Sequence, residues 1–200
     1  MEKPADTHYP IHDILRRRWS PRAFTDQPLE TERLGSLLEA ARWASSCFNE
    51  QPWSFIVARK EETEAYALVL SCLVEGNQLW AQRAPVLMLT IVKQTFDHNG
   101  KLNKHAWHDV GLSVGNLVMQ ATAMGLGVHQ LAGIYPDRVR SVYAIPEGHE
   151  PVSALAIGYK GDPACLPEGL QAKELAARSR KNLEDFVYTG RWGQAFSFTQ

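Results

Sequence analysis

The chain has 200 residues, 44% hydrophobic and 22% charged, and its formal net charge is -1. These values are ordinary for a globular protein, and the charge excludes a global attraction to nucleic acid or to an anionic membrane. The length is sufficient for one buried core, so we expect a single domain over residues 1–200. Cys47, Cys72 and Cys165 lack metal-binding spacing and leave one cysteine over after any pairing, which favours the reducing cytoplasm. No long apolar run indicates a secretory signal or a membrane span.

Hydrophobic periodicity predicts alternating helices and strands in the first half of the chain. The helix over 31–44 is the clearest, because Leu34, Leu37, Leu38 and Ala41 recur at helical spacing. In chain order we expect a loose arm over 1–9, a short helix over 11–18, the helix over 31–44, a strand over 53–58 and an amphipathic helix over 61–73.

The second half contains the most apolar segments. Residues 85–92 (PVLMLTIV) are apolar on both faces, which predicts an interior strand. A helix over 109–125, with Asp109 as its N-cap, is apolar almost all round and should be buried centrally or between subunits. The remaining expectations are a polar loop over 93–106, a connector over 125–133, a short helix over 135–143, a strand over 153–159, a helix over 168–177 and an aromatic tail over 186–200 that packs on another surface, such as a partner chain.

A polar loop between the helix over 31–44 and the following strand is the first candidate site. It gathers the small or polar side chains of Ser45, Ser46, Cys47, Asn49 and Gln51 within one short span, and rigid Pro52 follows. Such a density of hydrogen-bonding groups on a loop held at both ends suits a flat polar ligand.

Two basic clusters at opposite ends of the chain are the second candidate. Arg16 to Arg18 precede Ser20 and Arg22, and Arg178-Ser-Arg180-Lys181 lies near the C-terminus. Guanidinium groups bind phosphate through two hydrogen bonds, so the clusters could close on one phosphate from two sides. Taken singly, each cluster is better explained as solvated surface charge.

Other constellations are weaker. Gly125-Leu-Gly127 follows a helix rather than a strand and lacks the third glycine of a dinucleotide-binding loop. The pair His105 and His108 has no further ligands nearby, and there is no nucleophile elbow. No charged residue adjoins Cys47 in sequence to activate it as a nucleophile. By elimination, the chain points to a bound cofactor that carries the chemistry.

The motifs resemble those of the FMN-dependent nitroreductase family. The resemblance is carried, in the family's order, by residues 18–24 (RWSPRAF), 39–53 (EAARWASSCFNEQPW), Gly76-Asn77, 84–86 (APV), the helix over 109–125, 156–159 (AIGY), Arg178-Ser-Arg180 and 190–193 (GRWG). It implies an α+β fold with a central, mostly antiparallel sheet flanked by helices. It also implies an intertwined homodimer with FMN at the interface and the 186–200 tail packed on the partner.

The resemblance assigns cofactor-binding roles by position. Arg18, Ser20 and Arg22 form the first set of residues that bind the phosphate and the ribityl chain, and Trp19 flanks the ring. The polar loop supplies Ser45, Ser46, Cys47 and Asn49 from one subunit to a flavin anchored by arginines of the other. The remaining residues are Asn77 at the flavin edge, the backbone of Gln130, Leu131, Ala132 and Gly133 near the ring, and Arg178 and Arg180 as the C-terminal phosphate clamp. Ser45 and Cys47 depart from the family's Pro and second Ser.

The implied activity is hydride transfer from NAD(P)H through flavin N5 to a small acceptor such as a nitroaromatic, quinone or enone. No side chain is expected to be catalytic, and no metal is expected. Reductive dehalogenation and flavin fragmentation on the same fold remain alternatives, as does a non-catalytic flavin-binding dimer. Both enzymatic alternatives would need lid residues from the 93–106 loop. An anion-binding module for nucleic acid is disfavoured by the net charge.

Overall fold

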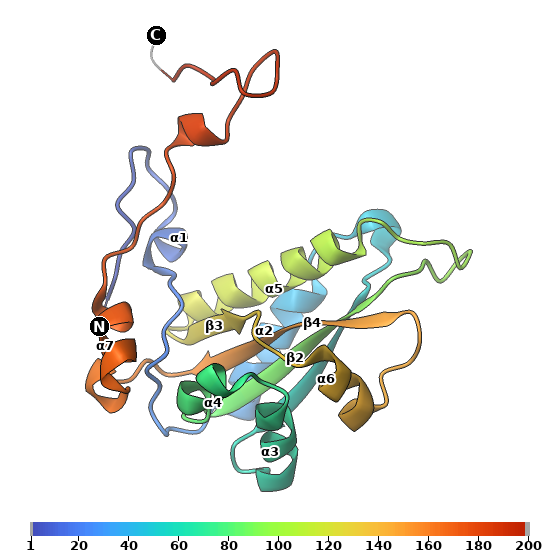
Figure 1. Ribbon diagram of the computed structural model, residues 1–200. Coiled ribbons are helices and arrows are strands. Elements are labelled where there is room, and N and C mark those ends of the chain that lie inside the picture. The colour runs from blue at the N-terminus through green and yellow to red at the C-terminus, as the bar shows by residue number, and fades with distance from the viewer. Residues whose placement is uncertain (1, 199–200) are drawn as a thin grey trace.

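A four-stranded antiparallel sheet organises the computed structural model, which describes residues 2–198 (Figure 1). The strand order is β1-β2-β4-β3, so β1–β2 and β3–β4 are neighbours, whereas the connection from β2 to β3 passes over the position of β4. The strands are β1 (Trp53–Arg59), β2 (Val86–Lys93), β3 (Gly127–Leu131) and β4 (His149–Gly158).

Strand β2 is central and covered on both faces, as its sequence predicts. All its residues except the last are buried. Because successive side chains of a strand point to opposite faces, Leu87 and Leu89 enter one core cluster whereas Val86 and Met88 enter another. The sheet therefore separates two hydrophobic cores.

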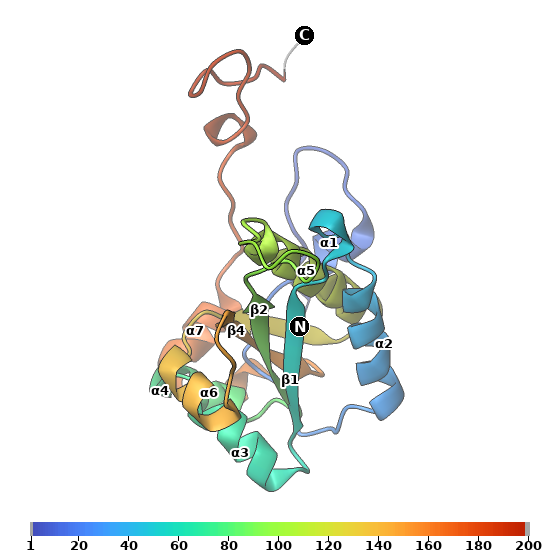
Figure 2. The ribbon, with the colours of Figure 1, turned by 90° about the vertical axis from the view of Figure 1, so that its right-hand side faces the viewer.

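Helices α2 (Thr31–Arg42) and α5 (Ala106–Ala123) cover one face of the sheet. Their buried residues, including Leu37 and Leu117, join the cluster that holds Val86 and Met88. At 18 residues, α5 is about 27 Å long, and it packs against β1, β2 and β3. Figure 2 shows α2 on the side of the sheet opposite to α3, α4 and α6.

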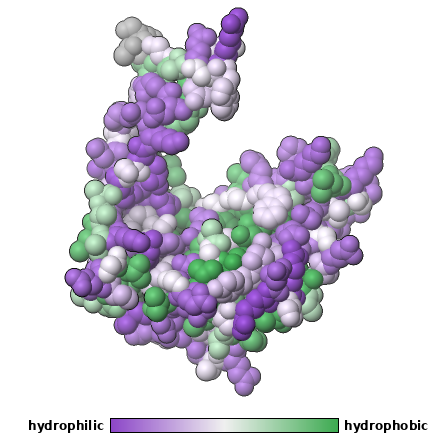
Figure 3. Space-filling view, in the orientation of Figure 1, coloured by the Kyte–Doolittle hydropathy of each residue, from purple (hydrophilic) through white to green (hydrophobic). Residues whose placement is uncertain are grey.

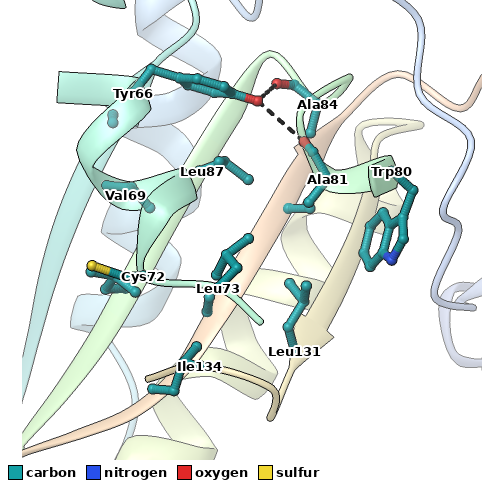
Figure 4. Packing of buried hydrophobic residues seen from close by; sticks show 14 of the residues in the cluster. Tyr66, Val69, Cys72, Leu73, Trp80, Ala81, Ala84, Leu87, Leu131 and Ile134 are labelled. Carbon is teal, nitrogen blue, oxygen red and sulfur yellow. Dashed lines mark hydrogen bonds between the residues drawn. The ribbon is translucent and has the colours of Figure 1, made fainter. Parts of the chain in front are cut away.

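The other face carries α3 (Thr63–Ser71), α4 (Glu75–Ala81) and α6 (Pro136–Tyr143). Figure 4 shows this core, in which Tyr66 of α3 reaches across to the turn that follows α4. Its hydroxyl lies 2.6 Å from the carbonyl oxygen of Ala84 and 3.1 Å from that of Ala81. The buried phenol thus satisfies its polar atom while its ring fills the core.

The two ends of the chain run together beyond the sheet. Helices α1 (Asp13–Arg17) and α7 (Glu168–Leu175) flank this region, and the residues after α7 rise away from the body as an extended tail (Figure 1). The arm over residues 2–12 is tied to it: the Arg178 guanidinium donates to the Lys3 carbonyl at 2.7 Å, and the rings of Tyr9 and Phe198 are 5.9 Å apart. The arm is therefore less loose than its sequence suggests.

The tail exposes aromatic side chains to an unusual degree. Trp192 is 92% exposed, and Phe186 is also exposed. In the space-filling view the arm and tail stand clear of the body and leave a broad hollow beside it (Figure 3). Large exposed apolar surfaces mark sites of association. The expectation that the tail packs on a partner stays a prediction, and residues 199 and 200 lie outside the described part of the chain.

Three details differ from the sequence-based expectation. The segment 125–133 is not only a connector, because β3 lies within it and pairs with β4. Helix α4 has no counterpart among the expected helices. Asp109 is not the N-cap of α5, because the helix begins at Ala106 and buries Asp109 in its first turn. The other expected helices and strands are confirmed, with shifts of a few residues at their ends. In the described part of the chain, no helix is long and apolar enough to cross a membrane.

Candidate functional site

Residues of both basic clusters line one pocket of about 380 Å³, although Arg16, Arg17 and Lys181 do not. One wall is the segment that follows α1, with Arg18, Ser20 and Arg22, and the opposite wall is the chain after α7, with Arg178 and Arg180. The Arg18 guanidinium donates to the Ser20 hydroxyl at 3.2 Å. Residues more than 150 positions apart therefore form one cationic surface, as the sequence predicts.

Burial and mutual repulsion both act on the cations of this pocket. Burial, followed by the nearby charges of Arg178 and Arg180, lowers the pKa of Arg18. Burial and the charge of Arg180 likewise lower the pKa of Arg178. A bound anion would relieve this repulsion, because opposite charge favours the charged form of each guanidinium.

Trp19 adds a hydrogen-bond donor without a partner. Its indole Nε1 is buried, and none of the described residues accepts its hydrogen. The Lys3 ammonium group lies 5.0 Å from the centre of the Trp19 ring, and both residues line the pocket. Buried donors are normally satisfied, so an orphan donor beside an arginine cluster fits a polar ligand such as a phosphate-bearing cofactor.

His129 is a pocket residue that the sequence-based assignment does not include. It lies on β3, its ring centre is 4.6 Å from that of Trp80, and its Nδ1 lies 3.0 Å from the Pro21 carbonyl oxygen. Burial, with the charge of Arg22 as the next cause, lowers the pKa of His129 to about 4. The imidazole is therefore neutral at pH 7 and donates its Nδ1 hydrogen to Pro21.

We expect this histidine to make the protein sensitive to acid. The folded-state pKa lies below the ordinary 6.5, so the unfolded chain binds a proton first as pH falls. The stabilisation is complete above pH 6.5 and is lost as pH falls towards 4, by about 3 kcal/mol at most. His129→Asn, which keeps a donor for Pro21, should flatten the pH dependence of the free energy of unfolding between pH 7 and 4.5, measured in urea. His98→Asn alters an exposed ring and should retain the wild-type slope.

The polar loop is held in an unusual backbone conformation. Phe48, Asn49 and Gln51 all have positive φ, between 52° and 57°, although none is glycine. The Cys47 amide donates to the buried Asp109 carboxylate at 3.0 Å, and the Gln51 amide donates to the Ser46 hydroxyl at 3.0 Å. These bonds fix the loop against the first turn of α5. Such strain persists only where surrounding contacts enforce it, and it clusters at functional sites.

The outer part of this loop touches the 93–106 segment. Phe48 is 83% exposed, and its ring meets that of Phe96 edge-on, with centres 5.9 Å apart. The Asp97 amide donates to the Glu50 carboxylate at 2.6 Å. The 93–106 segment, from which the enzymatic alternatives would need lid residues, therefore lies against the polar loop.

A third group of predicted residues lies at the end of β3. Asn77 of α4 donates to the Gly133 carbonyl at 3.0 Å, and a Cβ on Gly133 would come within 2.5 Å of the Asn77 side chain. Leu131 is buried in the core, so only its backbone is available to a ligand. Gln130 and Ala132 are exposed.

Within one chain, the polar loop and the basic pocket are far apart. The loop is bonded to Asp109 in the first turn of α5, whereas Pro21 beside the pocket contacts Gly127, just beyond the other end of the helix (Figure 1). The helical rise between Asp109 and Ala123 separates the polar loop from the basic pocket by roughly 20 Å. The loop and the basic residues therefore do not line a common pocket within one chain.

Comparison with known proteins yields consistent matches. The model of the nitroreductase family matches residues 15–75 and 67–159. A solved structure described as an oxidoreductase containing FMN is 37% identical, with a TM-score of 0.88 over 94% of this chain and 95% of that chain. A nitroreductase family protein from Clostridium difficile 630 is 26% identical, with a TM-score of 0.69 over 89% of this chain and 96% of that one. The FMN reductase (NADPH) of Bacillus subtilis is 27% identical, over 90% of this chain and 78% of that protein.

Proposed function

Because the chain belongs to the nitroreductase family, we propose that it is an FMN-dependent oxidoreductase that takes reducing equivalents from NAD(P)H. The observation that carries this proposal is the meeting of the two arginine clusters in one pocket, beside an unpartnered indole N–H. The arginines and the serine that line this pocket suit the phosphate and the polar ribityl chain of FMN. Bound FMN supplies the hydride-accepting and hydride-donating chemistry.

The chain's own residues bind and orient the cofactor. Arg18, Ser20, Arg22, Arg178 and Arg180 hold the phosphate end, because they line one pocket. The charges of Arg178 and Arg180 act on Arg18 there, and a bound phosphate would offset them. Asn77 and the backbone of residues 130–133 lie at the C-terminal end of β3. Their mutual hydrogen bond makes that edge rigid, which suits the positioning of a ring.

The polar loop of a second copy supplies the other side of the ring. The length of α5, which keeps the loop and the pocket of one chain apart, supports this arrangement. Residues 1–200 form a single domain whose aromatic tail packs on the partner, where Trp192 and Phe186 lose their exposure to water. The acceptor is a small molecule such as a nitroaromatic, quinone or enone.

A visible absorption spectrum tests the proposal. Protein reconstituted with FMN should retain flavin absorbance after desalting, and anaerobic addition of NADH or NADPH should bleach it. Added quinone or nitroaromatic should then restore the absorbance. Protein that retains no flavin contradicts the cofactor assignment. Flavin that stays oxidised in excess NADH and NADPH contradicts the enzyme assignment and favours a flavin-binding dimer.

A further inference from the structure

A buried carboxylate lies in the wall of the basic pocket. Glu174 of α7 is 1% exposed, although carboxylates are rarely buried without a specific role. Six cationic side chains line the same pocket, namely Lys3, Arg18, Arg22, Lys173, Arg178 and Arg180. By charge alone, Glu174 would weaken the binding of any phosphate there.

The hydrogen bonds of Glu174 show what it holds. One carboxylate oxygen accepts from the backbone N–H groups of Arg22, at 2.9 Å, and Ala23, at 3.1 Å. The other oxygen lies 3.1 Å from the Arg22 nitrogen and 3.9 Å from the Arg22 guanidinium. These backbone groups belong to the segment that carries Ser20 and Arg22, about 150 residues away in sequence.

The same residue connects to the other walls of the pocket. The backbone carbonyl of Glu174 accepts from the Lys3 ammonium group at 2.7 Å, and Arg178 follows four residues later in the chain. Arg178 in turn donates to the carbonyls of Lys3 and Arg16, at 2.7 and 3.0 Å. Glu174 therefore joins the arm, the first arginine cluster and the second.

We infer that Glu174 is a positioning residue for the phosphate site: its carboxylate fixes the Arg22–Ala23 backbone against α7, so that the two arginine clusters face the same phosphate. This inference rests on the proposed function, since the phosphate is that of FMN. Holding the cations in place before the ligand arrives reduces the ordering that binding requires. For Glu174 to favour FMN binding, the gain from holding the arginines in place must exceed the repulsion between its carboxylate and the phosphate.

Glu174→Gln distinguishes charge repulsion from positioning, because the two roles predict opposite changes in FMN affinity. The amide keeps the size of the side chain but removes its charge, and its NH₂ group replaces an oxygen that accepts from Arg22. If Glu174 acts only through its charge, FMN should bind more tightly. If it positions the arginines, FMN affinity should fall by about 10- to 100-fold, the range for hydrogen bonds that involve a charged group.

Riboflavin provides the specific readout, because it lacks the phosphate. Affinities of the purified protein for FMN and riboflavin are measured by flavin fluorescence quenching. We expect Glu174→Gln to lower the ratio of FMN to riboflavin affinity and to change riboflavin affinity much less. Glu168→Gln is the matched control, since Glu168 is exposed on the same helix and does not line the pocket. It should retain the wild-type ratio.

Glu174→Asp keeps the charge and withdraws the carboxylate by one methylene. It should also lower the FMN affinity, whereas a role through charge alone predicts the wild-type value. An unchanged or higher FMN affinity in Glu174→Gln, or an equal loss for both flavins, would overturn the inference. Failure of both Glu174 variants to fold would overturn it too, because the residue would then serve the core. Wild-type protein that binds neither flavin would instead refute the proposed function.

Discussion

Replacement of both Arg18 and Arg178 by alanine should abolish the retention of FMN at micromolar concentrations. The two guanidinium groups come from opposite walls of the pocket, and burial together with neighbouring cations lowers the pKa of each, which a bound anion would offset. A hydrogen bond to a charged group contributes about 1.5–3 kcal/mol, so two such losses lower the affinity by about 100- to 10,000-fold. Fluorescence titration with FMN and riboflavin measures the loss, which should be much larger for FMN.

Arg17→Ala is the matched control for this experiment. Arg17 belongs to the same basic run as Arg18, but its guanidinium is bonded to Asp13 on α1 and it does not line the pocket. Its removal should leave the FMN affinity close to that of the wild type. An Arg18/Arg178 double variant that binds FMN normally would show that the phosphate lies elsewhere.

Two variants that are inactive alone should restore activity when mixed. One chain carries Arg18→Ala and Arg178→Ala, and the other carries Ser45→Trp, which places a large ring on an exposed position of the polar loop. In the proposed dimer, each site needs the basic pocket of one chain and the loop of the other. Random exchange makes about half of the dimers mixed, and each mixed dimer has one intact site, so about a quarter of wild-type activity should return.

This complementation requires exchange of subunits, for example by mild denaturation and joint refolding. Each variant refolded alone is the control, and NAD(P)H oxidation with a quinone is the readout. If one chain contained a complete site, the mixture would be as inactive as its components.

Much of the fold follows from local patterns in the sequence. The interior position of β2 is predictable because every residue of Val86 to Val92 is apolar except Thr90. Helix α4 is harder to predict, because its sequence EGNQLWA buries only Trp80 and Ala81. Strand β3 is obscured by Gly125 and Gly127, which indicate a helix end, and it exists because β4 offers a pairing edge.

The candidate site, too, contains residues that local sequence patterns predict and residues that they do not. Arginine clusters are visible in the sequence because their members are neighbours, and the pocket confirms that they converge. Glu174 and His129 are not visible in this way. Glu174 acquires its role from backbone amides more than 150 positions away, and His129 from the Pro21 carbonyl and the Trp80 ring. Such roles exist only after the chain has folded.

Because Phe48, Asn49 and Gln51 have left-handed backbone, selection of variants for stability and selection for activity should favour different residues at these positions. Glycine adopts positive φ without steric strain, whereas a bulky residue such as Phe48 does so at an appreciable cost. A library of variants screened for heat resistance should therefore accumulate glycine at these positions. A library screened for catalysis should keep the side chains, because glycine would release the loop from the geometry that its bonds to Asp109 and Ser46 impose.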